Sequence, residues 1–353
     1  MKWNKTESVM FMKKTYIECL RIIAIILVIY NHTRELGFTL YQYTSDACSY
    51  YLSVFMIPVC KTAVPIFLMI SGATLLGKKE DYRQLFSGRI ARYVGIILFW
   101  GTLQYLRYVR TGKAGVSVRN WWNNIYSSPK LETYWYLYLY LGFLLLLPLL
   151  RKAVSGMTDK DYRYLFGLSC VSSILSMIGH FSGCFINYSV FLLPSVFLYP
   201  ILGYWIDNAL NSPHGKDARK YGLAAILPLC VIVPVSLIFA RDTDWNGDFM
   251  EAIQCFTPIV SFGIFGFIKC TVAGHPHSAR LKKAILAVGD TAFGIYLTED
   301  MIRNQAIKFI IYICKRFPYC SFIYAINICS RGDICIHYEE NSCRFVKHML
   351  HRL

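Results

Sequence analysis

The sequence predicts an all-α fold, a polytopic integral membrane bundle of about ten transmembrane helices. Of its 353 residues, 55% are hydrophobic and only 16% are charged, and the mean hydropathy is +0.39. Soluble domains contain about 25% charged residues. The net charge of +16 comes from basic residues that lie between long apolar runs. This pattern excludes an ordinary soluble domain, a disordered chain and a nucleic-acid binder, and it makes membrane lipid the first expected partner.

A spanning helix needs about 20 mostly apolar residues. Ten runs meet this requirement, at 16–33, 50–76, 90–108, 134–150, 163–180, 188–206, 221–240, 252–270, 284–301 and 303–329. The second run is long enough to tilt or break, and it contains Pro58 and Pro65. Proline is tolerated in such helices where neighbouring groups satisfy the carbonyls that it frees.

The basic residues predict the orientation in the plasma (inner) membrane. With the N-terminus in the cytoplasm, the inside segments carry twenty lysine and arginine residues and the outside segments carry nine. Cytoplasmic loops are enriched in these residues, so we expect residues 1–15 to be cytoplasmic. The 107–132 loop is unusually basic for an outer loop, and its Trp121, Trp122 and Tyr126 indicate that it lies against the membrane interface.

We expect one membrane domain over residues 16–316, followed by an atypical polar tail over 317–353. Five of the thirteen cysteines fall in the last forty residues. Two explanations of the tail stay open, divergence of the sequence and a change of reading frame in the gene. His275 and His277 flank a proline, but nothing nearby supplies further ligands, so we expect no metal site.

Ionisable residues inside a span are costly and indicate function. In the first span, Arg21 and His32 are eleven residues apart. This spacing brings them within roughly 20° of one helix face, with a rise of roughly 16 Å. Glu18, at i−3 from Arg21, can partly neutralise it. A neutral imidazole is the usual general base for a hydroxyl, although both residues could also be simple helix-end groups that reach the headgroups.

Two further motifs follow the first span. Ser71-Gly72, in an apolar run, allows either close helix packing or a local break where a substrate touches the backbone. Arg89 and Arg92 lie one turn apart at the inner mouth of the third span. They could form an anion clamp for phosphates, or they could be ordinary positive-inside charge.

Two segments later in the chain also carry candidate residues. The aromatic segment 133–151 is most simply an interfacial belt. Asp290 and Glu299 end a short apolar segment, and they could relay protons or be helix-end charges.

These motifs, in this order, resemble membrane-bound acyltransferase family 3, which includes many bacterial sugar O-acetyltransferases. Segments similar to the family's are ECLRIIAIILVIYNHT, PIFLMISG, GRIARY, TYWYLYLYLGFLLLLPLL and AFGIYLTED. The chain departs from the family pattern at Glu299, where members often have histidine. It also departs at Thr133-Tyr134, where many have a histidine before the tryptophan, and in its polar tail.

The resemblance implies an O-acyltransferase that uses acyl-CoA, with acetyl-CoA as the expected donor. Arg89 and Arg92 would hold the phosphates of coenzyme A, and Arg21 would steer the donor. His32 would then deprotonate a hydroxyl of a glycan or lipid-linked glycan of the cell envelope.

The resemblance also implies that Ser71, Trp135 and Glu299 contact the substrates. Two other functions stay open. One is a transporter or exporter of a polysaccharide or small polar solute, with Asp290 and Glu299 as a proton relay, although no inverted repeat is visible. The other is an inactive family member, made so by the altered tail.

Overall fold

The computed structural model describes residues 5–33, 36–42, 44–126, 134–182, 195–210, 215–239, 256–274 and 278–316. In this part of the chain 88% of residues are helical and no strand occurs, which confirms the all-α fold. The first helices are α1 (Lys5–His32), η2 (Leu40–Gln42), α2 (Ala47–Cys60), α3 (Ala63–Leu75), α4 (Tyr82–Gln84), the π-helix η3 (Leu85–Ile90) and α5 (Ala91–Arg110). The others are α6 (Val118–Tyr126), α7 (Trp135–Gly156), α8 (Asp159–Ser182), α9 (Ser195–Ala209), α10 (Gly215–Phe239), α12 (Thr257–Gly274) and α13 (Ala279–Arg316).

Four helical segments of the described chain are long and apolar enough to cross a membrane. They are Thr15–His32, Ala47–Leu75, Trp135–Gly156 and Lys216–Leu237. Thr257–Ala273 is apolar but shorter. The figure of ten spans therefore stays a prediction, as do the domain boundaries.

The expected second span consists of two helices. α2 ends at Cys60 and α3 begins at Ala63, with Lys61 and Thr62 between them. Pro65 explains the break, because a proline ring clashes with the carbonyl four residues earlier and its nitrogen cannot donate to that carbonyl. The break leaves a lysine at the junction of two apolar helices.

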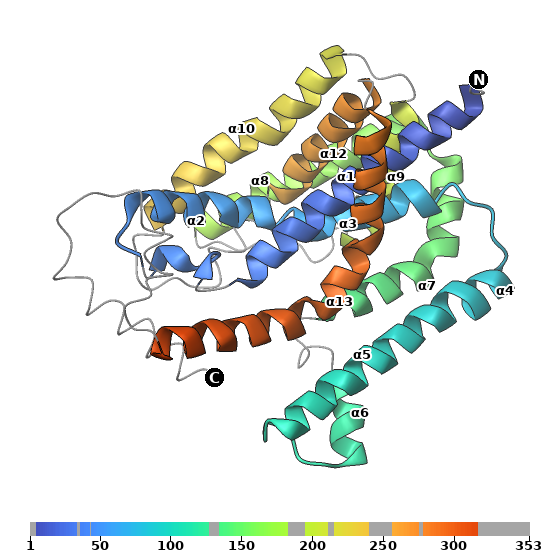
Figure 1. Ribbon diagram of the computed structural model, residues 1–353. Helices are drawn as coiled ribbons and strands as arrows, with labels where there is room; N and C mark the ends of the chain where they lie inside the picture. The colour runs from blue at the N-terminus through green and yellow to red at the C-terminus, as the bar shows by residue number, and fades with distance from the viewer. Residues whose placement is uncertain are drawn as a thin grey trace.

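The expected ninth and tenth spans begin as one continuous helix. α13 runs from Ala279 to Arg316 without interruption, so the boundary expected near residue 302 is absent. The sequence around it, Glu299 to Arg303, contains neither glycine nor proline to end a helix. Figure 1 shows that α13 nevertheless bends along its length.

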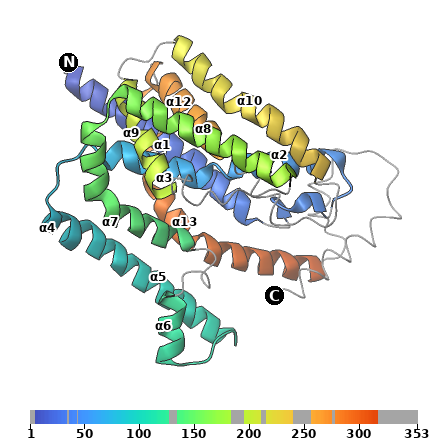
Figure 2. The ribbon, with the colours of Figure 1, turned by 180° about the vertical axis from the view of Figure 1, so that it is seen from behind.

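Helix α1 lies at the centre of the bundle and packs against α3, α12 and α13. α10 packs against α12 on one side of the molecule, and α5 and α6 lie on the opposite side in both views (Figures 1 and 2). This arrangement places the polar residues of α1 against two other helices that carry charged side chains.

The Ser71-Gly72 motif produces a close helix contact. A Cβ atom added at Gly72 would overlap the backbone of Pro200 in α9. One added at Gly203, also in α9, would overlap the carbonyl of Met69. The two glycines thus let α3 and α9 pack backbone to backbone, which confirms the packing interpretation of the motif.

The basic loop after α5 contains the short helix α6. The rings of Trp122 and Tyr126 are exposed and stack at 6.2 Å, while the Trp121 indole donates a 3.0 Å hydrogen bond to Thr102 of α5. Its position at a membrane interface stays a prediction. The tail from residue 317, and His275 with His277, lie outside the described residues.

Candidate functional site

A cavity of about 1490 Å³ runs between α1, α3, α7, α9 and α13. Ligand pockets usually measure about 300–1,000 Å³, so this one can take a large substrate or two substrates. Glu18, Arg21 and Arg89 line one end, and His32 and Lys61 line the other. We call these the Arg21 end and the His32 end. Both residues of the predicted α1 stripe therefore face one elongated cavity.

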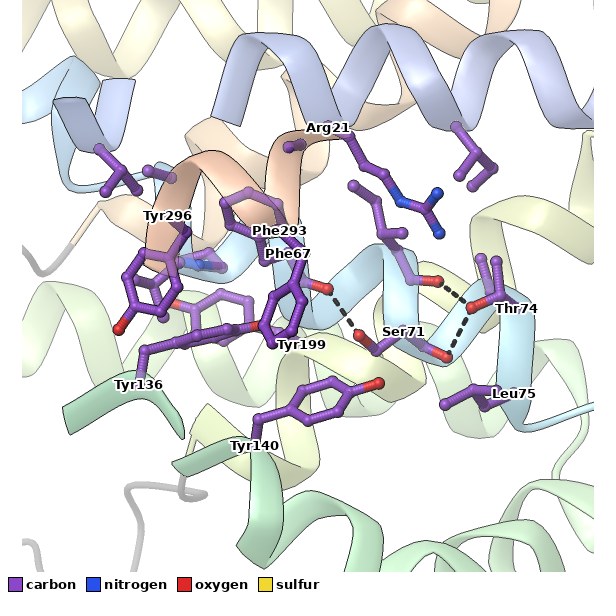
Figure 3. Close-up of a pocket in the computed structure, with 18 of the residues that line it drawn as sticks. Arg21, Phe67, Ser71, Thr74, Leu75, Tyr136, Tyr140, Tyr199, Phe293 and Tyr296 are labelled. Atoms are coloured by element: carbon purple, nitrogen blue, oxygen red, sulfur yellow. Dashed lines mark hydrogen bonds between the residues drawn. The ribbon is translucent and has the colours of Figure 1, made fainter. Parts of the chain in front are cut away.

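Arg21 projects from α1 toward the turn of α3 that holds Ser71 and Thr74 (Figure 3). Its guanidinium donates a 2.6 Å hydrogen bond to Glu18, as the i−3 spacing predicted. Glu18 is only 2% exposed, whereas Arg21 keeps 32% of its side chain accessible. The pairing offsets part of the cost of a cation in a span and leaves a face of Arg21 for an anion.

Aromatic rings line the cavity between its two ends. The rings of Tyr93 and Tyr140 lie 4.9 Å apart, and those of Tyr136 and Tyr296 lie 5.8 Å apart. Phe293 stacks on Tyr93 and completes this aromatic wall (Figure 3). The segment 133–151 is therefore more than an interfacial belt. Tyr136 and Tyr140, spaced i and i+4, were the sequence signal for a shared inward face.

His32 is held by an acid from the far end of the sequence. Its Nδ1 lies 2.9 Å from Oε2 of Glu299, a carboxylate whose side chain is 5% exposed. The other oxygen, Oε1, accepts a 2.7 Å hydrogen bond from Arg303. With an ionised carboxylate as acceptor, Nδ1 of a neutral His32 carries the proton, and Nε2 has a free lone pair.

The acid network extends from Glu299 along α13 and across to α5. Asp300 accepts 2.8 Å and 2.6 Å hydrogen bonds from Arg303 and Arg107. The sequence interpretation missed these three residues, because it counted both arginines as outside-segment charge. The spacing of Glu299, Asp300 and Arg303, at i−4, i−3 and i, was the available signal.

Arg89 and Arg92 do not face the cavity together. Arg89 lines it and donates a 2.8 Å hydrogen bond to Glu80, whereas Arg92 is exposed and is not among the cavity-lining residues. Arg89 belongs to the π-helix η3 and Arg92 to α5. The α-helical spacing assumed from the sequence does not apply within the wider π turn.

Glu80 joins Arg89 to Arg151 of α7. Arg151 donates 3.1 Å hydrogen bonds to the Glu80 carboxylate and to the Leu75 carbonyl at the end of α3. Burial raises the pKa of the Glu80 carboxyl, but the hydrogen bonds and charges of the two arginines outweigh it and hold that pKa below its ordinary value. Glu80 therefore stays ionised and fixes Arg89 at the Arg21 end.

The remaining predicted residues divide between the cavity and other contacts. Ser71 and Trp135 line the cavity, and the Ser71 hydroxyl donates to the Phe67 carbonyl at 2.8 Å. Asp290 also lines it, but it lies nine residues from Glu299 on α13. That spacing puts the two acids on opposite sides of the helix, about 13.5 Å apart along its axis, so they form no direct relay.

No group of three or more His, Cys, Asp or Glu residues that could hold a metal ion occurs within the described ranges. The cavity instead offers arginine side chains, an acid-supported histidine and an aromatic wall. This combination suits an anionic group, a proton transfer and an apolar chain.

A helical bundle with a buried histidine and a cationic cavity end is the kind of site that a membrane group-transfer enzyme needs. A family model described as an acyltransferase domain matches residues 14–314, and the chain belongs to this family, acyltransferase family 3. No curated protein and no solved structure matches the chain. The apolar helices and the family together make it a membrane protein with an acyltransferase domain.

Proposed function

We propose that the protein is an O-acyltransferase of the plasma membrane, oriented with its N-terminus in the cytoplasm. It transfers an acyl group, with acetyl as the expected case, from acyl-CoA to a hydroxyl of a cell-envelope glycan or lipid-linked glycan. One observation carries the proposal: a histidine with its Nδ1 held by Glu299 lines the same cavity as two arginines at the opposite end.

The donor binds from the cytoplasmic side, at the Arg21 end. Its phosphates contact Arg89, which Glu80 holds in place, and Arg21, which keeps an accessible face. Arg92 is exposed just outside the cavity, so its contribution is to the part of coenzyme A that remains in solvent. The pantetheine arm follows the aromatic wall toward His32 and brings the thioester to the His32 end.

His32 acts as the general base. Its Nε2 takes the proton of the acceptor hydroxyl while the hydroxyl oxygen attacks the thioester carbonyl. The tetrahedral intermediate collapses, the carbon–sulfur bond breaks, and the thiolate of coenzyme A leaves and takes up a proton, which the imidazolium can return. The products are an O-acyl ester and free coenzyme A, and no covalent enzyme intermediate is needed.

Glu299 acts as a positioning residue for that base. It fixes the tautomer of the imidazole and stabilises the imidazolium that forms when the proton is taken. Arg303 bonds the other oxygen of the same carboxylate, which limits its rotation. Trp135 and Ser71 contribute to the walls that the substrates contact.

Reconstituted protein tests the function directly. Proteoliposomes that contain the purified chain are given acetyl-CoA on one side and an envelope glycan extract on the other, and free thiol is measured with a colorimetric reagent. We expect thiol release that depends on the extract. Passage of solute across the vesicle without thiol release would instead indicate a transporter, and the absence of both would indicate an inactive protein.

A further inference from the structure

Lys61 is a cation at the His32 end that the proposed mechanism does not use. It follows α2 at the break before α3, it lines the cavity, and its residue is only partly exposed. Its ammonium lies 5.4 Å from the ring centroid of Phe38. The Phe38 backbone N–H in turn donates a 3.1 Å hydrogen bond to Thr33, the residue after His32. These contacts fix Lys61 near the histidine rather than near Arg21.

No carboxylate of the described residues forms an ion pair with Lys61, whereas the other cations that line the His32 end or support it are balanced. Arg107 and Arg303 are bonded to Glu299 and Asp300, two cations against two acids. Lys61 therefore adds one positive charge to this end of the cavity. A cation held within an apolar part of a span marks a substrate path more often than it serves packing.

Phe38 holds the stem of Lys61 without neutralising its charge, because a cation–π contact leaves the ammonium protons free to donate. An ammonium group offers three donors and no acceptor, so its complement is an anionic oxygen. The acyl donor cannot supply that oxygen here, since its phosphates would bind at the Arg21 end. The complement must therefore come from the acceptor.

We infer that the acceptor carries an anionic group, a carboxylate or a phosphate, which binds Lys61 while the reacting hydroxyl is at His32. This inference rests on the proposed function for the identity of the acceptor site. It narrows the acceptor to an acidic sugar, such as a uronic acid, or a phosphorylated sugar. A neutral sugar would leave Lys61 without a partner in a partly desolvated site, at a cost in affinity.

Three matched probes test the inference: methyl glucoside, methyl glucuronide and methyl glucoside 6-phosphate. Their binding to the purified full-length protein in detergent is measured by calorimetry. We expect at least one of the two anionic probes to bind about tenfold more tightly than the neutral one. The probe that gains affinity tells a carboxylate acceptor from a phosphate acceptor. Equal affinity for all three, or no binding of any, would overturn the inference.

Variants then assign the preference to Lys61. Lys61→Met should bring the ratio of anionic to neutral affinity close to one, and Lys61→Arg should keep it. Lys152→Met is the matched control, because Lys152 is an exposed residue of α7 that does not line the cavity. A preference that survives in a folded Lys61→Met protein contradicts the assignment, and the wild-type comparison stands even if that variant does not fold. Acetyl-CoA-dependent thiol release is measured separately, so that failure of the proposed function is distinguished from failure of this inference.

Discussion

His32 and Glu299 are 267 residues apart in the chain, yet Nδ1 of the histidine lies 2.9 Å from Oε2 of the glutamate. The contact exists because α1 and α13 pack side by side. It converts a histidine in an apolar span into a base with a defined tautomer. Family members often have histidine where this chain has Glu299, so this departure from the family pattern supplies the histidine with an acid partner.

Glu299→Gln should lower kcat for acyl transfer by about 100-fold with little change in KM, because the amide leaves the shape of the site intact and removes the charge that stabilises the imidazolium. Steady-state thiol release at varied acetyl-CoA concentration measures both constants. Thr298→Val, on the same helix, is the control. If Glu299→Gln keeps wild-type kcat, the positioning role is wrong.

Arg89→Ala should raise the KM for acetyl-CoA about tenfold, the loss expected for a charge-assisted contact with phosphate. Arg92→Ala should change it less, because Arg92 is exposed and does not line the cavity. The two variants are assayed side by side with acetyl-CoA as the varied substrate. Equal effects of the two would restore the symmetric clamp that the Arg-x-x-Arg spacing predicts.

Asp300→Asn should destabilise the protein by about 2 kcal/mol, since it leaves Arg107 and Arg303 without their shared carboxylate in a mostly buried position. Thermal unfolding in detergent, followed by circular dichroism, measures the effect. Asp290→Asn is the comparison, because that aspartate is exposed on the same helix. A variant as stable as the wild type would show that the network is not structural.

Gly72→Ala should destabilise the fold by about 1–3 kcal/mol, because the added methyl group meets the Pro200 backbone, which cannot move as a side chain can. Gly95→Ala in α5 is the matched control. Nothing lies near a Cβ atom added there, and the change should stabilise the helix by about 0.5–1 kcal/mol. Opposite shifts of the unfolding temperature are expected, and shifts of the same sign would contradict the close packing.

The link between Arg89 and Arg151 should depend on pH through Glu80. Because the folded state lowers the pKa of this carboxyl, its contribution is full above the ordinary value of 4.5 and is lost as the pH falls below that value toward the lowered one. Unfolding temperatures of wild type and Glu80→Gln are compared from neutral pH downward. The wild type should be more stable at neutral pH by about 1 kcal/mol, and the difference should vanish in acid. A difference that stays constant with pH excludes this origin.

Local geometry made part of the site predictable from sequence. Arg21 and His32 lie on one helix, so their spacing alone placed them on a shared face, and both line the cavity. Glu18 was predictable as the partner of Arg21 for the same reason. The pairing of His32 with Glu299 was not, because it depends on how two distant helices pack.

Two other features depended on backbone geometry and long-range contacts that no local pattern specifies. The exposure of Arg92 follows a π-helical turn. Lys61 was hidden within one long apolar run and became a junction residue only because the chain breaks before Pro65. The aromatic residues of α7 were interpreted as a membrane belt, since aromatic side chains suit both an interface and a cavity wall.

The most direct test of the central claim is the turnover of His32→Ala with acetyl-CoA and the envelope glycan extract, measured as free thiol in proteoliposomes with matched protein content. If His32 is the base, kcat should fall by about 100- to 10,000-fold, and the protein should still bind coenzyme A at the Arg21 end. Wild-type turnover in a folded His32→Ala protein would contradict the account.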